Sequence, residues 1–452
     1  MGWMSRRLKG GMIKLRYQLG KRPKRIAFSL FHKGGKHASS AQPQRDSSTE
    51  SSVPRLRDLK DLKGGKHSNG AIFGRIRGAA AAIRNYFVGV NWLLALMGVL
   101  ASIYGAVMIK STGVVSLTVQ ISAIVLGVIA YLMIAMFDIS HLAVFWKLAM
   151  AGGVLLLLSV LVIGRTAGGN AGWVSIHLGS ADLSFQPGEV VKIVMIITLA
   201  KHLEILGEKI TTFKGVVQIA MHFMIYAVAL VFSKDDGMLL TYGILFVAMV
   251  FAAGIQLRYL LFGGAALVAA TPFIWQYLLD YYQKMRILVV LDPTLDLEGK
   301  GYHAYISKIA IANGGLTGMG YGAGEVTQTS NPGNLPAKHT DFIFSVICEE
   351  MGIIGAALAI GILAAIIIAC FSVAAKVRHS RFSYLLAIGV AVMLTFQMVL
   401  NVGMCTGVVP VIGLTLPFFS SGGSSVLTMF ISIGMVASVG AHVRPRTLSD
   451  II

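Results

Sequence analysis

The stretch YFVGVNWLLALMGVLASIYGAVMI, residues 86–109, contains no charged side chain. A helix rises about 1.5 Å per residue and the hydrocarbon core of a bilayer is about 30 Å thick, so about 20 apolar residues can cross it. This stretch therefore predicts a membrane-spanning helix. The whole chain of 452 residues is 55% hydrophobic and 13% charged, which excludes a water-soluble globular protein and predicts an integral membrane protein.

Similar apolar stretches recur to the end of the chain. They predict an all-α polytopic membrane protein of about ten transmembrane helices, with a large extracellular loop between helices 7 and 8. Two outer loops, residues 165–187 and 282–340, are too long for simple turns, so we expect the chemistry at the outer face. The predicted spans are residues 86–109, 114–137, 141–164, 188–206, 215–232, 238–256, 259–281, 341–370, 382–408 and 423–443.

Positive charge is concentrated at the N-terminus. Residues 1–85 hold 20 Lys and Arg against 4 Asp and Glu, whereas the rest of the chain holds 19 against 16. With few aromatic residues, this tail is predicted to be disordered. The tail lies beside a transmembrane segment, which favours anionic membrane lipids as its partner. Nucleic acid is the less favoured partner, because the sequence shows no nucleic-acid-binding domain next to the basic residues. Residues 86–443 form the predicted membrane domain, and residues 444–452 form a short C-terminal tail.

The basic residues in the short loops predict the orientation, since Lys and Arg accumulate on the cytoplasmic side. Ten crossings with a cytoplasmic N-terminus return the C-terminus to the cytoplasm. Three basic residues fall in the short outer loops: Lys110, Arg165 and Lys234. Nine fall on the cytoplasmic side: Lys201, Lys209, Lys214, Arg258, Lys376, Arg378, Arg381, Arg444 and Arg446.

Charged residues inside apolar spans are costly and are candidates for function. Glu189 and Lys192 open the fourth span, and their i, i+3 spacing places both on one face of a helix. They form either a functional pair or a self-neutralising pair at the interface. Glu349 and Glu350 in the eighth span favour a structural role facing the bundle interior.

A polar segment, LPAKHTDFIF at residues 335–344, leads into the eighth span. Thr340 or Asp341 is well placed to cap that helix, whose N-terminus favours a negative charge. The sequence leaves a capping carboxylate and a catalytic one as alternatives. The glycines of residues 314–324 include GxGxG spacing, but no strand precedes them, so a dinucleotide site is rejected in favour of turns or flexible backbone near a lipid headgroup.

Taken in order, the outer motifs resemble the SEDS family (shape, elongation, division and sporulation), which includes FtsW, RodA and SpoVE. Any one of these motifs is weak evidence, but their order along residues 86–443 is specific. They are residues 185–189 FQPGE with Lys192, residues 291–293 LDP, residues 301–303 GYH with Ser307, residues 339–344 HTDFIF with Glu349, Glu350 and Gly352, and residues 410–425 PVIGLTLPFFSSGGSS.

Several positions depart from the family pattern. Gly188 replaces the usual Ser, His303 replaces Gln, and Ala337 stands where the family usually has Glu. Residues 233–237, SKDDG, keep only the Asp and Gly of QPDxGT, and Ser421 replaces Tyr. These departures concern substrate contacts more than the reaction, because Asp341, Glu189 and Lys192 are retained.

The resemblance implies a peptidoglycan glycosyltransferase, a hexosyltransferase that polymerises lipid II into glycan strands at the outer face of the bacterial cytoplasmic membrane, in cell division or elongation. The growing glycan is carried on undecaprenyl pyrophosphate. A class B penicillin-binding protein, which is a transpeptidase, is the expected partner. A lipid II flippase or other transporter of lipid-linked substrates is the alternative, and a non-catalytic scaffold is a third possibility.

The resemblance also implies roles for individual residues. Asp341 is expected to act as the general base. Lys192 is the expected cation, which either steadies Asp341 or meets phosphate, and Glu189 is expected to orient that lysine. Arg286 and Lys338 are expected to meet the pyrophosphate. A divalent metal, Mg²⁺ or Mn²⁺, is expected to be held mainly by the substrate's pyrophosphate, since no protein cage is visible. Further substrate-binding candidates are His339, Thr340, Ser424 and Ser425.

Overall fold

Apolar helices long enough to cross a bilayer dominate the computed structural model, which describes residues 91–443 except 116, 164, 168–169, 179–180, 297–298 and 329–333. The predictions for residues 1–85 and 444–452 lie outside the described residues. Within the described part, eight helical segments have the length and hydropathy of a membrane span. They are α2 (Trp92–Ser111), α3 (Leu117–Met136), α4 to α5 (Ile139–Leu142, then η2 Ala143–Phe145, then Trp146–Ile163), α7 (Phe213–Phe232), α9 (Leu257–Phe273) with η4 (Ile274–Leu278), α13 (Ile343–Lys376), α14 (Arg381–Thr406) and α15 (Gly423–His442).

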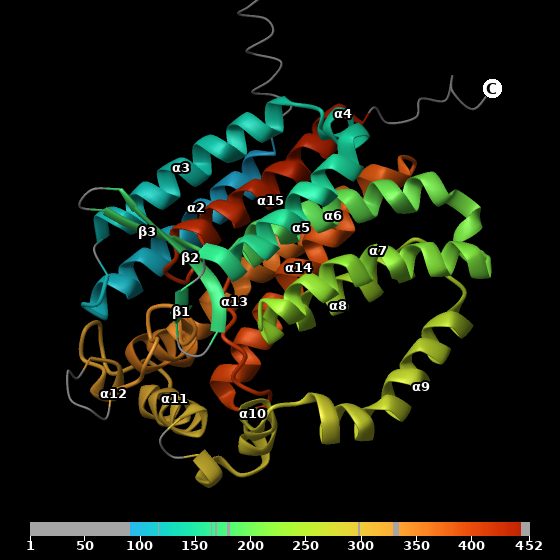
Figure 1. Ribbon diagram of the computed structural model, residues 1–452. Coiled ribbons are helices and arrows are strands. Elements are labelled where there is room, and N and C mark those ends of the chain that lie inside the picture. The colour runs from blue at the N-terminus through green and yellow to red at the C-terminus, as the bar shows by residue number, and fades with distance from the viewer. Residues whose placement is uncertain are drawn as a thin grey trace, which may run out of the picture. The chain divides into compact units, whose positions relative to one another are not determined.

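Two further helices complete the bundle (Figure 1). Helix α6 (Pro187–Leu206) carries four charged residues, and α8 (Asp236–Ala252) is 17 residues long. Together with the eight spans they match the ten predicted crossings one for one. The helical polytopic fold is therefore confirmed, and the predicted boundaries differ from the observed ones by a few residues in most spans.

Close helix packing forms the core around α15. Helix α15 packs against α3, and α13 packs against α14 and α2. Small residues allow this closeness: a Cβ atom at Gly127 of α3 would collide with the Phe430 ring of α15. At Gly105 of α2 a Cβ would lie 2.5 Å from the carbonyl oxygen of Phe419. Small interface residues are the usual way for spanning helices to approach one another.

The first long loop contains strands, which were not predicted from the sequence. Strands β1 (Arg165–Ala167), β2 (Asn170–Leu178) and β3 (Ala181–Phe185) form an antiparallel sheet in the order β1-β2-β3. Successive antiparallel strands need only short connections, so a segment of about twenty residues can hold all three. Strand β3 leads directly into α6.

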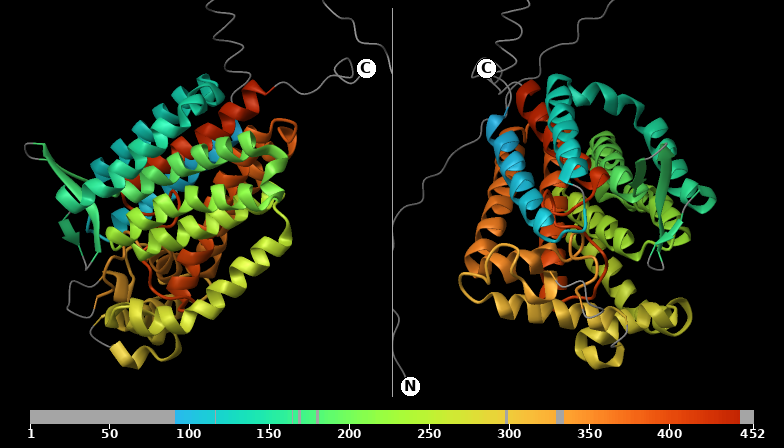
Figure 2. Two further views of the ribbon diagram at one scale, coloured as in Figure 1. Left: turned by 45° about the vertical axis from the view of Figure 1, so that its right-hand side comes forward. Right: turned by 90° about the vertical axis from the view of Figure 1, so that its left-hand side faces the viewer.

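The second long loop is confirmed between α9 and α13, but it is largely helical. It contains α10 (Tyr281–Leu291), η5 (Pro293–Asp296), α11 (Lys300–Gly314) and the short α12 (Glu325–Gln328). Figure 2 shows α10 and α11 gathered at one end of the bundle. Helices α6, α8 and α13 all begin at this end, which we call the site end; η3 (Gly207–Thr211) lies at the other end, between α6 and α7.

The glycine-rich segment after α11 packs into a break in α13. Gly352 interrupts α13 with φ 65° and ψ −166°, a conformation that favours glycine. The amides of Ile353 and Met319 bond across this break to the Gly315 and Glu349 carbonyls, at 3.0 and 2.9 Å. A Cβ at Gly318 would collide with a backbone carbonyl of α13. Gly314 and Gly318 therefore provide close backbone contact, and residues 315–317 and 321–322 lie in turns, which was one of the two uses predicted for these glycines.

Candidate functional site

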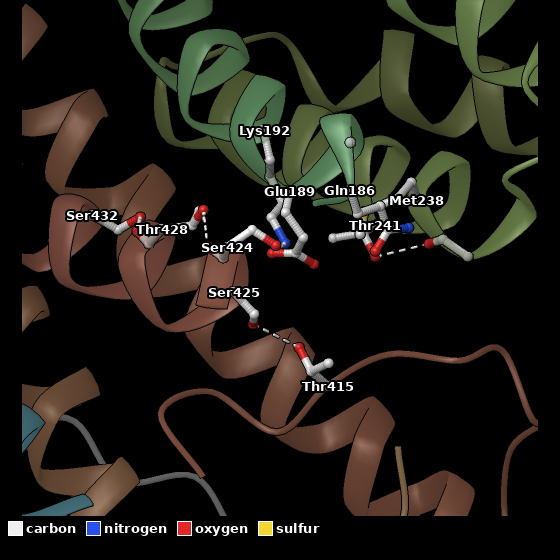
Figure 3. Close-up of polar contacts among 12 residues, drawn as sticks. Gln186, Glu189, Lys192, Met238, Thr241, Thr415, Ser424, Ser425, Thr428 and Ser432 are labelled. Carbon is white, nitrogen blue, oxygen red and sulfur yellow. Dashed lines mark hydrogen bonds and ion pairs between the residues drawn. The ribbon is translucent and has the colours of Figure 1, made fainter. Parts of the chain in front are cut away.

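A buried ion pair opens α6. Lys192 Nζ lies 2.9 Å from Glu189 Oε2, and the two residues are 0% and 3% exposed. Pro187 in the first helical turn, where an amide hydrogen would have no helical partner, starts the helix just before them. Figure 3 shows the pair on the side of α6 toward the start of α15, next to Ser424, and α15 packs against α6.

Hydrogen bonds tie the start of α6 to the start of α8. Gln186 Nε2 donates to Asp235 Oδ2 at 2.7 Å, and the Tyr242 hydroxyl donates to the Gly188 carbonyl at 2.8 Å. Asp235 also caps α8 by accepting from the Met238 amide at 3.2 Å. Residues 185–192 and 233–237, two separate motifs in the sequence, therefore form one unit. The Asp retained in the second motif is the residue that joins them.

The environment of Asp235 favours its neutral form. Burial raises the pKa of the Asp235 carboxyl above its ordinary value of 3.8, and the nearby Glu189 and Asp236 carboxylates raise it further. The hydrogen bonds from Gln186 and from the Met238 amide lower the pKa and oppose this effect. Desolvation disfavours the charged form of an acid, so this carboxyl is a weaker acid than an exposed Asp.

Asp236 joins this unit to α10 of the large loop. Gln283 Nε2 donates to both Asp236 carboxylate oxygens, at 2.8 and 2.9 Å. Arg286 Nη1 lies 3.8 Å from Asp236 Oδ2, and the guanidinium stands 4.4 Å from the centre of the Tyr282 ring. Arg286 is buried, so this predicted pyrophosphate ligand is held at the site end by an acid and an aromatic ring.

Asp341 is half-buried in the turn that precedes α13. Its backbone carbonyl accepts hydrogen bonds from Asn401 Nδ2 at 2.8 Å and from Cys405 Sγ at 3.7 Å, both on α14. Its carboxylate oxygen Oδ2 would lie 3.5 Å from a Cβ atom at Gly413. The backbone at Asp341 is thus fixed by a helix far along the chain, and its side chain faces the segment between α14 and α15.

That segment, residues 410–422, connects Asp341 to the helices around it. The Ser421 amide donates to the His339 carbonyl at 2.8 Å, and the Ser420 hydroxyl donates to the Thr340 carbonyl at 2.6 Å. Beyond these bonds, Asn401 Nδ2 donates to the Leu414 carbonyl at 2.6 Å. One buried amide therefore holds both irregular segments.

The same segment reaches α8 and α15. A Cβ at Gly237 of α8 would lie 2.6 Å from the Ile412 carbonyl oxygen. Thr415 Oγ1 and Ser425 Oγ share a hydrogen bond of 3.0 Å, which Figure 3 shows below the Glu189–Lys192 pair. Residues 410–422 thus run from the α8 side of the site to the start of α15, where Ser424 and Ser425 lie.

The N-cap position of α13 is not held by an acid. Helix α13 begins at Ile343 with Phe342 in the N-cap position and no side-chain capping bond. The Thr340 hydroxyl instead donates to the Ala337 carbonyl at 3.2 Å. Neither residue therefore occupies the N-cap position, because the turn at residues 337–342 places both before Phe342. The motif at 301–307 also packs here, with the His303 and Phe342 rings 6.1 Å apart.

Glu349 and Glu350 have the structural role that was expected. Glu349 accepts from the Thr327 amide at 3.0 Å and from the Val326 amide at 3.1 Å. Glu350 accepts from Ser111 Oγ at 2.8 Å and from Gln328 Nε2 at 2.5 Å. Both are fully buried, and their carboxylates hold the glycine-rich segment and α12 against α13.

Lys338 points into the same region. Its Nζ donates to the Thr327 carbonyl and, at 3.4 Å, to Asn334 Oδ1. Burial lowers the pKa of Lys338, while Glu350 and Glu349 raise it. Burial and the Lys338 charge both lower the pKa of His339, so this imidazole is neutral near pH 7.

Three residues that position the site were missed in the sequence. Asn401 and Tyr242 lie inside apolar spans, where an uncharged polar side chain is a weak signal by itself. Gln186 belongs to a recognised motif, but its partner Asp235 lies 49 positions away. A search for polar side chains in the apolar spans near their site ends would have found the first two.

Comparison with known proteins identifies the family. The model for FtsW, RodA and SpoVE, described as cell cycle protein, matches residues 84–445. This chain belongs to that family. It is 33% identical over 299 residues to a protein of Hydrogenovibrio crunogenus named "Probable peptidoglycan glycosyltransferase FtsW", and the match covers 66% of this chain and 74% of that protein.

Two further relatives of the family extend the comparison. The peptidoglycan glycosyltransferase MrdB of Escherichia coli K12 is 30% identical over 291 residues, which cover 64% of this chain and 76% of that protein. A solved structure named "Structural coordination of polymerization and crosslinking by a peptidoglycan synthase complex" matches with a TM-score of 0.66 and 30% identity, covering 78% of this chain and 97% of the other.

The family departures have local structural counterparts. A Cβ at Gly188 would lie 2.9 Å from Met238 Cγ, so Met238 fills the space where the family usually has a serine side chain. Ala337 has φ 50°, and its carbonyl accepts from the Thr340 and Phe342 amides at 3.1 and 3.2 Å. The turn before α13 therefore forms although Ala337 replaces the usual Glu.

The buried pair predicts a test by double substitution. Lys192→Met alone leaves the Glu189 carboxylate buried without its partner, and we expect a loss of about 3–5 kcal/mol in the free energy of unfolding. Glu189→Gln combined with Lys192→Met removes both charges and should lose much less. Denaturant unfolding in detergent micelles measures both variants. Equal losses in the single and the double variant would contradict a coupled pair.

The raised pKa of Asp235 predicts a pH dependence. A carboxyl whose pKa is raised in the folded state binds more protons when folded, so the free energy of unfolding falls as pH rises from about 4 through the raised pKa. Asp235→Asn keeps an oxygen for the Met238 amide and removes this component. Thermal unfolding of both proteins should be measured between about pH 4 and pH 8. The melting temperature of the wild type should fall relative to that of the variant as pH rises. The exposed Asp280→Asn serves as control, and parallel curves for wild type and Asp235→Asn would refute the assignment.

Proposed function

We propose that this protein is a peptidoglycan glycosyltransferase that joins a glycan carried on undecaprenyl pyrophosphate to the 4-hydroxyl of lipid II. Family membership supports this, as do the relative named peptidoglycan glycosyltransferase MrdB and the similar structure of a peptidoglycan synthase complex. The observation that carries the proposal is the convergence of the family motifs at the site end, where residues 410–422 link Asp341 to the starts of α8 and α15.

Asp341 is the proposed general base. The attacking hydroxyl oxygen forms a bond to C1 of the donor sugar, its proton passes to the carboxylate, and the bond from C1 to the pyrophosphate breaks. The fixed backbone of Asp341 and its half-buried side chain suit this role, because a base must be held in position yet remain open to substrate. The turn before α13 provides both the fixed backbone and the partly exposed side chain.

The Glu189–Lys192 pair is the proposed source of positive charge for the reaction. With both groups buried 2.9 Å apart, the ammonium group of the lysine is held in one place, and Glu189 limits the net charge of the pair. Ser424 at the start of α15 lies on the same side of α6. Lys192 is therefore proposed to stabilise the developing negative charge, and Glu189 to orient it.

Arg286 and Lys338 are the proposed pyrophosphate contacts. Arg286 lines a small cavity together with Lys308 of α11, of about 10 Å³. This volume is close to that of one water molecule, so pyrophosphate binding requires α10 or residues 407–411 to move apart. His339, Thr340 and Ser425 border the same end and remain proposed substrate contacts.

A divalent metal would come with the substrate. Within the described residues, no group of three or more His, Cys, Asp or Glu side chains could hold a metal ion. The described residues by themselves thus do not form a resident metal site. Mg²⁺ or Mn²⁺ held by the pyrophosphate would help to neutralise the leaving group, and the roles proposed for Asp341, Lys192 and Glu189 do not depend on it.

The proposed setting is the bacterial cytoplasmic membrane, with both termini in the cytoplasm and the site end outside. The excess of Lys and Arg in the loops at the opposite end supports this orientation. A class B penicillin-binding protein is the proposed partner, since the similar structure is a complex that coordinates polymerization and crosslinking. The basic tail is proposed to contact anionic lipids.

An enzyme fits the distribution of polar groups better than a transporter does. Transporters bind substrate near the bilayer midplane between broken helices. In the described residues, the family motifs lie at the start of α6, α8, α13 and α15, which is one end of the bundle. Purified protein supplied with lipid II on the site-end side of a membrane should therefore produce glycan strands rather than translocate the lipid.

The role of Asp341 predicts a selective loss of activity. Asp341→Asn should leave folding and membrane insertion intact, because Asn401 and Cys405 bond to the backbone carbonyl rather than to the side chain. Polymerisation of purified lipid II should fall by at least about 10²-fold, the lower range for loss of a general base. Asp280→Asn, an exposed acid at the start of α10, should keep wild-type activity. A polymerising Asp341→Asn variant would remove this carboxylate from the mechanism.

Metal removal provides an independent test. Excess chelator should slow polymerisation of lipid II by wild-type protein, because the leaving pyrophosphate loses its counter-ion. Added Mg²⁺ or Mn²⁺ should restore the rate. The melting temperature of the protein alone should not change, since the described residues form no three-ligand site. An unchanged rate after complete metal removal would exclude the ion from the reaction.

A further inference from the structure

A second cavity lies at the opposite end of the bundle from the site. Its volume is about 320 Å³, and it is lined by Ala252 and Ala253 at the end of α8 and by residues around the start of α14. Helices α8 and α13 begin at the site end and finish here. The cavity is therefore separate from the glycosyl-transfer site. The residues around α14 are Arg378, His379, Arg381, Tyr384 and Leu385.

The lining is strongly basic. Arg378 and His379 are exposed, Arg381 is half-buried, and no acidic residue is among the described residues that line the cavity. Glu204, at the end of neighbouring α6, is already paired with Lys201 at 2.6 Å. The two arginines and His379 thus line one cavity, and none of the described lining residues is an acid that could neutralise them.

Arg381 is built into the wall. Its Nη2 donates to the Ala253 carbonyl at 2.8 Å, which fixes the guanidinium against the end of α8. Its Nε is buried and has no hydrogen-bond partner among the described residues. A buried donor without a partner costs free energy. Because Nε has almost no exposed surface, an anion reaches it only when the cavity wall shifts, and it would then supply the missing acceptor. A guanidinium presents two parallel N–H groups that match a phosphate.

We propose that this cavity binds the phosphodiester headgroup of an anionic phospholipid. The volume lies within the range of small-molecule sites and is large for a phosphate alone. The apolar part of the lining, Ala252, Ala253 and Leu385, suits a glycerol and the start of an acyl chain. Phe251 and Leu257, on either side of the α8–α9 turn, are 63% and 58% exposed, so hydrocarbon can continue past the cavity.

The bound headgroup would join parts of the chain that carry the site. The turn at residues 377–380 connects α13, which Asp341 precedes, to α14, which carries Asn401. The Arg381–Ala253 hydrogen bond already links this turn to α8. A phosphate held by Arg378 and Arg381 would strengthen that link at the end of the bundle where basic loops gather, which is the end expected to face anionic lipid.

Lipid binding by the full-length protein in detergent tests the proposal. Phosphatidylglycerol would be titrated and bound lipid counted by native mass spectrometry, for wild type and for the double variant Arg378→Gln/His379→Gln. Removing two basic groups near a membrane surface should weaken binding about tenfold or more. Arg258→Gln is the matched control, because Arg258 is exposed at the same end on α9 and does not line the cavity. It should bind within about twofold of wild type.

Two further arms separate the alternative ligands. Phosphatidylcholine, which has no net charge, should bind the wild type much more weakly than phosphatidylglycerol, and millimolar inorganic phosphate should not displace the lipid. Both exposed side chains can be replaced without opening the core, and unchanged melting temperatures would confirm folding. Displacement by millimolar phosphate, or an equal loss of binding in Arg258→Gln, would overturn the assignment.

Discussion

Backbone that is not helical cannot be left unpaired inside a bilayer, because hydrocarbon offers no hydrogen-bond partner. Two segments of non-helical backbone, residues 337–342 and 410–422, lie at the site end of the spanning helices, and each satisfies part of the other. The Asn401 amide bonds to the carbonyls of Asp341 and Leu414, and Ser420 bonds to Thr340. This mutual bonding places a carboxylate at a defined position without building it into a helix.

The same constraint gives the charged residues their arrangement. Glu189 and Lys192 satisfy each other within one turn of α6, and Asp235 is paired through Gln186 and through the cap of α8. Because Asp235 bonds to α6 and Asp236 bonds to α10, the three helices α6, α8 and α10 are held in register at the site end. A glycosyltransferase that works on lipid-borne sugars needs a rigid edge of this kind at the membrane surface.

The sequence predicted the parts that depend on local pattern. Ten spans follow from the length of apolar stretches, and the contact of Glu189 with Lys192 follows from their spacing along a helix. The sheet at residues 165–185 and the helices α10 to α12 were not predicted. Short elements in polar loops have no long apolar stretch and no clear hydrophobic period that would reveal them. The role of Asn401 depends on partners 13 and 60 positions away, and the contact of the 314–324 glycines with the break at Gly352 was not predicted because it too is long-range.

Photo-crosslinking with a lipid II analogue that carries a reactive group on its sugar tests the central claim most directly. A glycosyl-transfer site at Asp341 predicts labelled peptides that contain residues 186–192 and 337–342, two segments that only tertiary contacts bring together. Labelling confined to the opposite end of the bundle, around residues 252–258 and 378–385, would contradict that site.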